Sequence, residues 1–167
     1  MPGGRLPHAG KVGRMCSSHV RFAHVNLVAQ DWKKLVAFYE RVFHCTAVPP
    51  ERDLGGPWLE ASTGVEGAHI RGLHLRLPGH GDHGPTLEVF QYNRLAERGI
   101  PAPNRPGLAH IAFAVGDVEA VRQAVIAAGG TSVGETVTAE IPNAGRITFA
   151  YVTDPEGNII ELQRWSA

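Results

Sequence analysis

The chain is 167 residues long, 43% of its residues are hydrophobic, and 16 basic side chains balance 16 acidic ones. This size fits one compact domain or two small modules with a shared core, and the absence of net charge argues against a nucleic-acid or membrane partner. Two cysteines, Cys16 and Cys45, are too few for a disulfide framework and favour a cytoplasmic location.

The first half of the chain predicts one helix and four strands. Alternating apolar and polar residues predict a strand over 20–28, and Asp31 is expected to cap a helix that runs to about Phe43. Residues 50–68 and 78–85 are rich in Gly and Pro and are predicted to be loops. Further strands are expected at 46–48, 70–77 and 86–92, which gives the order β-α-β-β-β.

The second half repeats this order. A strand is expected over 108–115, and Asp117 is predicted to cap a helix through Ala128. Strands are then expected at 131–141, 146–153 and 158–165. The predicted organisation is a disordered leader (1–18), a first βαβββ module (19–93), a Pro-rich linker (94–107) and a second βαβββ module (108–167).

Two short motifs are each written twice along the chain. FAHVNLV at 22–28 recurs as LAHIAFA at 108–114, and TLEVFQY at 86–92 resembles IIELQRW at 159–165. One histidine therefore opens each half and one glutamate closes it, and each lies on the strand face opposite the aliphatic residues. The four candidates are His24, Glu88, His110 and Glu161.

These four side chains could converge in one concavity. Two imidazoles and two carboxylates suit Zn, Ni, Co, Mn or Fe, all of which accept mixed nitrogen and oxygen ligands. A lone strand histidine is more often a satisfied polar group, but four equivalent positions need one explanation. The repeat therefore favours one divalent metal ion. His74 and Arg76 share the same predicted face, where they could contact a carbonyl or anionic group or simply be solvated.

The paired halves, the two AH[VI] strands, the TLEVFQY strand and the DPEGNIIEL ending resemble the vicinal oxygen chelate superfamily over about residues 20–165. That group includes glyoxalase I, methylmalonyl-CoA epimerase, extradiol dioxygenases, fosfomycin-resistance enzymes and bleomycin-binding proteins. The resemblance implies an α+β fold in which two tandem βαβββ modules form a cup-shaped mixed sheet around a metal site, in a homodimer.

Motif by motif, His24, Glu88, His110 and Glu161 match the four metal positions of glyoxalase I. The resemblance implies a glyoxalase-like lyase or isomerase that acts on a small α-hydroxycarbonyl substrate through a metal-stabilised enediolate. It makes Glu161 the first candidate for the base and Glu88 its counterpart, although both could be simple ligands.

Two departures bear on the substrate. Val28 stands where glyoxalase I typically has an arginine for a glutathione carboxylate, and Tyr92 replaces an asparagine, so a glutathione adduct is not expected. The alternatives are an extradiol-type Fe(II) dioxygenase and a non-catalytic protein that binds a small molecule such as an antibiotic. The side chains expected to contact the substrate are those of Asn26, His74, Arg76 and Tyr92.

Overall fold

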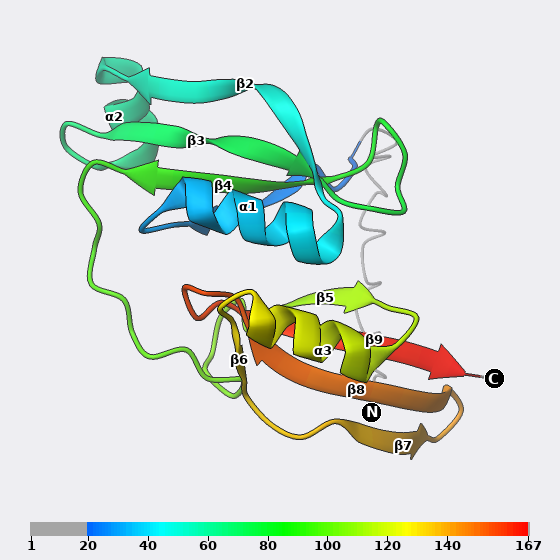
Figure 1. The fold of residues 1–167 in the computed structure, drawn as a ribbon. Coiled ribbons are helices and arrows are strands. Elements are labelled where there is room, and N and C mark those ends of the chain that lie inside the picture. The colour runs from blue at the N-terminus through cyan, green and yellow to red at the C-terminus, as the bar shows by residue number, and fades with distance from the viewer. Residues whose placement is uncertain (1–19, 167) are drawn as a thin grey trace, which may run out of the picture.

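The computed structural model describes residues 20–166, so the predicted leader at 1–18 lies outside the described residues. The chain forms two sheets, with helices α1 and α3 on the same side of them (Figure 1). The first sheet has the order β1-β4-β3-β2, and the second has the order β5-β9-β8-β6 with β7 also paired to β8. The strands are β1 (His24–Val28), β2 (Thr46–Gly55), β3 (His69–Arg76), β4 (Thr86–Tyr92), β5 (Ile111–Ala114), β6 (Thr131–Ser132), β7 (Val137–Ile141), β8 (Gly145–Thr153) and β9 (Ile159–Ser166).

Helix α1 (Trp32–Phe43) covers the first sheet as predicted. The side chain of Asp31 accepts a hydrogen bond from the Lys34 amide at 3.2 Å, which satisfies a free N–H group at the helix start. His44 ends the helix in the left-handed conformation, with φ at 55°. Apolar residues at helical spacing make the buried face. That face consists of Trp32, Leu35, Val36, Phe38, Tyr39 and Phe43.

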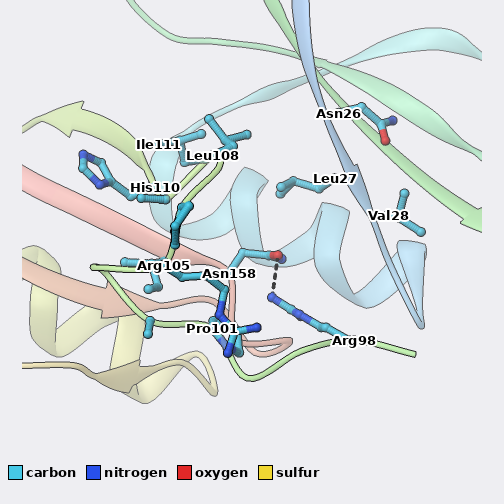
Figure 2. Close-up of a pocket in the computed structure, with 14 residues that line it drawn as sticks. Asn26, Leu27, Val28, Arg98, Pro101, Arg105, Leu108, His110, Ile111 and Asn158 are labelled. Carbon is cyan, nitrogen blue, oxygen red and sulfur yellow. Dashed lines mark hydrogen bonds between the residues drawn. The ribbon is translucent and has the colours of Figure 1, made fainter. Parts of the chain in front are cut away.

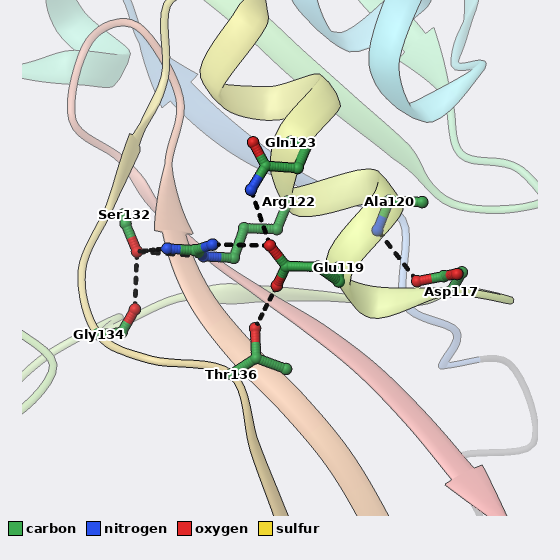
Figure 3. A network of polar contacts seen from close by, with 8 residues as sticks. All are labelled: Asp117, Glu119, Ala120, Arg122, Gln123, Ser132, Gly134 and Thr136. Atoms are coloured by element: carbon green, nitrogen blue, oxygen red, sulfur yellow. Dashed lines mark hydrogen bonds and ion pairs between the residues drawn. The ribbon is translucent and has the colours of Figure 1, made fainter.

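Helix α3 (Val118–Ala127) covers the second sheet and is tied to the segment between β6 and β7 (Figure 3). Glu119 accepts hydrogen bonds from Gln123 at 2.7 Å and Thr136 at 2.8 Å, and Arg122 donates to the Ser132 hydroxyl at 3.0 Å. These bonds hold the segment against the helix. The strand predicted over 131–141 is therefore divided into β6 and β7.

The prediction of loops is wrong for residues 50–63 and is confirmed for residues 64–68. Strand β2 continues past its prolines to Gly55, because it is the edge strand of its sheet, where a missing N–H group interrupts no ladder. A second helix, α2 (Pro57–Thr63), follows, with proline at its first position and Gly64 in the left-handed conformation after its end. It buries Leu59 in a small apolar cluster with Ala68, Ile70, Leu54, Phe90 and Tyr92.

One hydrophobic core joins the two halves. The Phe43 ring of α1 stacks on Phe113 of β5, with 4.2 Å between ring centroids and 19° between planes. Residues from α1, α3 and both sheets belong to the same buried cluster. Among the described strands, β1 pairs with β4 and β5 with β9, so β1 and β5 are facing edges that are not hydrogen-bonded to each other.

The turn between β8 and β9 connects the halves through polar contacts. The carboxylate of Asp154 is 1% exposed and accepts hydrogen bonds from the Glu156 and Asn158 amides, the Asn158 side chain and the Tyr39 hydroxyl. The Glu156 carboxylate accepts from the Gln30 and Asp31 amides, each at 2.8 Å. Because Gln30, Asp31 and Tyr39 belong to the first half, this turn fixes it against the second.

The predicted α+β fold of two modules is confirmed, with α2 and the divided strand as additions. Within residues 20–166, no helix is long and apolar enough to cross a membrane.

Candidate metal and substrate site

Glu88 lies at the centre of a polar cluster on the first sheet. Its Oε2 atom is 3.2 Å from His24 Nε2 and accepts a hydrogen bond from Asn26 Nδ2 at 3.3 Å. Its Oε1 atom is 2.8 Å from His74 Nε2. The Nδ1 atom of His74 is 3.0 Å from the Thr86 hydroxyl, which fixes the orientation of the imidazole ring. The two neighbouring strands, β1 and β3, thus both present side chains to the carboxylate on β4.

Glu161 has the corresponding place on the second sheet. Its Oε2 atom is 3.0 Å from His110 Nε2 and accepts a hydrogen bond from the Tyr151 hydroxyl at 3.1 Å. The side chain of Glu161 is 14% exposed, the same fraction as that of Glu88. Among the described residues, no hydrogen bond or ion pair involves its Oε1 atom, so one carboxylate oxygen is free of protein partners there.

The strand registers show that the two clusters are equivalent. Glu88 lies opposite Asn26 of β1, and Glu161 lies opposite Ala112 of β5; each partner follows its histidine by two positions. On the other side, β3 places His74 opposite Glu88, and β8 places Tyr151 opposite Glu161. The duplicated motif therefore builds the same pair of side chains in each half.

The third member of the cluster is His74 in the first half and Tyr151 in the second. The pKa values of these two side chains are shifted by different causes. Burial lowers the pKa of His74, and the nearby Arg52 guanidinium and His24 imidazole lower it further, against the opposing effect of Glu88. Burial also raises the pKa of Tyr151, and the adjacent Glu161 carboxylate raises it further. The Tyr151 hydroxyl therefore stays protonated at neutral pH and donates to Glu161.

The donor types suit a divalent cation, but the clusters are separate. Within residues 20–166, no group of three or more His, Cys, Asp or Glu side chains is arranged to hold one metal ion. The matched His–Glu contacts of 3.2 Å and 3.0 Å fit two bidentate halves of a mixed nitrogen and oxygen site. Convergence of all four on one ion remains a prediction.

The predicted substrate contacts are distributed more widely than expected. Asn26 and His74 lie with Glu88. Arg76 instead forms an ion pair with Asp82 at 3.3 Å, and Tyr92 packs in the apolar cluster of α2. Sequence reasoning missed Tyr151, although its place in the alternating pattern of β8, opposite the candidate Glu161, was a usable signal.

A cavity of about 270 Å³ lies between the facing ends of β1 and β5 (Figure 2). It is closed on one side by the linker, whose Arg98 donates to the Asn158 side chain at 2.9 Å. Asn26 and His110 both line it. The cavity therefore adjoins one candidate residue from each half.

A family model described as the glyoxalase/bleomycin resistance protein/dioxygenase superfamily matches residues 21–162. A glyoxalase family protein from Bacillus cereus superposes with a TM-score of 0.76 at 18% identity, over 95% of this chain and 100% of that chain. A glyoxylase/bleomycin resistance protein/dioxygenase domain from Frankia has a TM-score of 0.56 at 19% identity, over 88% and 98%. A fosfomycin resistance protein from Listeria monocytogenes has a TM-score of 0.54 at 17% identity, over 89% and 93%.

A comparison with curated proteins gives no match. At such low identities the solved structures show a shared fold and leave the reaction open. The family model, in contrast, spans both halves of the chain and all four candidate ligand positions. The chain is therefore a member of the glyoxalase/bleomycin resistance protein/dioxygenase superfamily.

Proposed function

We propose that the protein is a divalent-metal-dependent lyase or isomerase that moves a proton between neighbouring carbons of a small α-hydroxycarbonyl compound. The observation that carries this proposal is the matched pair of contacts, His24 with Glu88 and His110 with Glu161. A duplicated His–Glu pair has no role in the hydrophobic core. It supplies two neutral and two anionic donors, which suit Zn, Ni, Co, Mn or Fe.

These four side chains would hold the metal ion. When bound, the ion would withdraw electron density from the substrate oxygens and ease removal of a proton from the adjacent carbon. Glu161 suits the role of base, because its Oε1 atom has no partner among the described residues. Glu88 suits the role of a fixed ligand, because His74 holds one of its oxygens and His24 and Asn26 contact the other.

Metal uptake tests this proposal first. The purified protein is expected to take up one divalent ion per chain from Ni, Co, Zn, Mn or Fe. Replacing His24 or His110 by alanine should lower the affinity by more than the roughly 10- to 100-fold that loss of an outer-shell partner costs. Equilibrium dialysis with elemental analysis measures the number of ions bound and their affinity.

We also propose that the protein is a homodimer. Sedimentation of the metal-loaded protein tests this.

Variants of His74 and Tyr151 test whether Glu88 acts as a fixed metal ligand and Glu161 as the base. His74→Ala should weaken metal binding roughly 10- to 100-fold, because Glu88 loses the donor that orients it. His69→Ala is the matched control, since His69 lies on the same strand but contacts Asp53 at 2.7 Å. Tyr151→Phe should instead lower kcat with little change in metal affinity. Equal metal loss in the His74 and His69 variants would contradict this assignment.

A non-catalytic binding protein is the second candidate, and one observation favours it. A cavity of about 520 Å³ lies between β1, β5 and the loop after β3, with Val25, Leu87 and Phe113 among its apolar lining. Such a cavity suits a small, partly apolar ligand. If the protein takes up no added metal but binds such a compound, the binding function would replace the enzyme proposal.

Oxygen consumption with catechols and Fe(II) would instead identify a dioxygenase.

A further inference from the structure

The cavity between β1, β5 and the linker carries positive charge without a matching acid. Arg98 and Arg105 line it, and no Asp or Glu is among its lining residues. Within residues 20–166, none of the ion pairs involves either arginine. A concave surface of this kind attracts small anions.

Neutral contacts orient Arg98, which forms no ion pair with a described residue. Its guanidinium donates to the Glu156 carbonyl and to the Asn158 amide oxygen, and Figure 2 shows the second of these contacts. Both acceptors are uncharged, so the arginine is positioned at the cavity edge while its positive charge remains available. A guanidinium fixed in this way has already lost part of its rotamer freedom before a ligand arrives.

Gly99 allows Arg105 to lie over the same stretch of linker. A Cβ atom placed on Gly99 would be 2.2 Å from Arg105 Nη1, closer than such atoms approach in real proteins. Any side chain at this position would displace the guanidinium. The glycine therefore leaves room for the Arg105 guanidinium over the linker residue that follows Arg98, and both arginines line the cavity.

We propose that this cavity binds the anionic group of a small carboxylate or phosphate compound through Arg98 and Arg105. Planar guanidinium groups pair with the oxygens of both anions, and two arginines can share one such group. The candidate metal ligand His110 is also among the residues that line this cavity. That the bound anionic group is part of the substrate rests on the proposed function, whereas anion binding itself does not.

Amide NMR titration of the protein, after EDTA has removed any metal and has itself been removed by dialysis, tests the site. Glycolate and inorganic phosphate are the anionic probes, and glycolamide is a neutral compound of nearly the same shape as glycolate. We expect saturable shifts of amides in 98–111 with the anions, larger at low salt, and none with glycolamide. The stronger of the two anions identifies the preferred group. Equal binding of glycolamide and glycolate would overturn the proposal.

Three variants locate the interaction. Arg105→Gln should weaken glycolate binding about five- to tenfold, because a charge-assisted hydrogen bond is lost. Gly99→Ala should weaken it at least about twofold by displacing the guanidinium without removing it. Arg41→Gln, at the exposed end of α1, is the control and should bind as the parent does. Unchanged binding by both Arg105→Gln and Gly99→Ala would refute the site.

The two proposals fail separately. Anion binding without metal uptake would remove the enzyme proposal and keep the anion site. Metal uptake and proton exchange without anion binding in the linker cavity would remove the anion site and keep the enzyme proposal.

Discussion

Replacing Glu161 by glutamine is expected to abolish metal-dependent exchange of substrate hydrogen with solvent deuterium. A positioned general base contributes about 10²- to 10⁴-fold to a rate, and glutamine cannot accept the proton. The amide keeps the size of the side chain and can still accept a hydrogen bond from Tyr151. Loss of exchange can be followed by NMR of an α-hydroxycarbonyl compound in D₂O.

Glu88→Gln is the matched comparison for this variant. Glu88 has contacts on both oxygens, with His74 on one and with His24 and Asn26 on the other, so its substitution should weaken metal binding more than it lowers kcat at saturating metal. Metal content measured on both variants separates loss of the ion from loss of the base. Undiminished exchange in Glu161→Gln with the metal retained would remove Glu161 from the role of base.

Replacing Asp154 by alanine should cause a large loss of stability. The carboxylate is 1% exposed and accepts hydrogen bonds from two backbone amides, the Asn158 side chain and the Tyr39 hydroxyl. Alanine would leave several of these donors buried without partners, at a cost of about 3 kcal/mol or more. Urea unfolding of the parent and the variant measures the difference in the free energy of unfolding.

Tyr39→Phe provides the graded comparison. It removes one hydroxyl that donates to Asp154 at 3.0 Å and leaves the other hydrogen bonds in place, so we expect a loss of roughly 1–2 kcal/mol. The buried ring should keep its apolar contacts within α1 and the core. If Asp154→Ala were no more destabilising than Tyr39→Phe, the turn would not hold the two halves together as described.

Asp154 also predicts a pH dependence for the same comparison. Burial raises the pKa of this carboxyl above 3.8, although its hydrogen bonds with Asn158, Tyr39 and Glu156 oppose the shift. A raised pKa in the folded protein means that the protonation-linked part of its contribution to stability is complete below pH 3.8 and is lost as the pH rises through the folded value. Asp154→Asn lacks this loss, so its stability relative to the parent should improve as the pH rises from about 3 to 6.

Local sequence patterns predicted helices α1 and α3. Asp31 and Asp117 each cap a helix whose apolar stripe faces a sheet, and both signals lie within a few residues of the element they define. The error at 50–68 came from reading glycine and proline as loop residues. Only the position of β2 at a sheet edge, far from the local pattern, shows that prolines are tolerated there.

The candidate site was predictable as far as the repeat extended. His24 with Glu88 and His110 with Glu161 are equivalent in sequence, and each pair is in contact in the structure. Tyr151 was missed because its counterpart in the first half is His74. The two halves therefore have different residue types at this position, and the repeat does not mark it. Its role follows from strand register, which places it opposite Glu161.

By itself, the sequence determined the two-module fold, the superfamily and the four repeated positions, because period-2 and helical spacing, caps and duplicated motifs are all local properties. Tertiary structure decided which side chains surround each glutamate, and that Arg98, Arg105 and His110 line one cavity. It also decided that a buried aspartate in the last turn secures the first helix. These depend on register and on contacts between residues far apart in the chain, which no local pattern records.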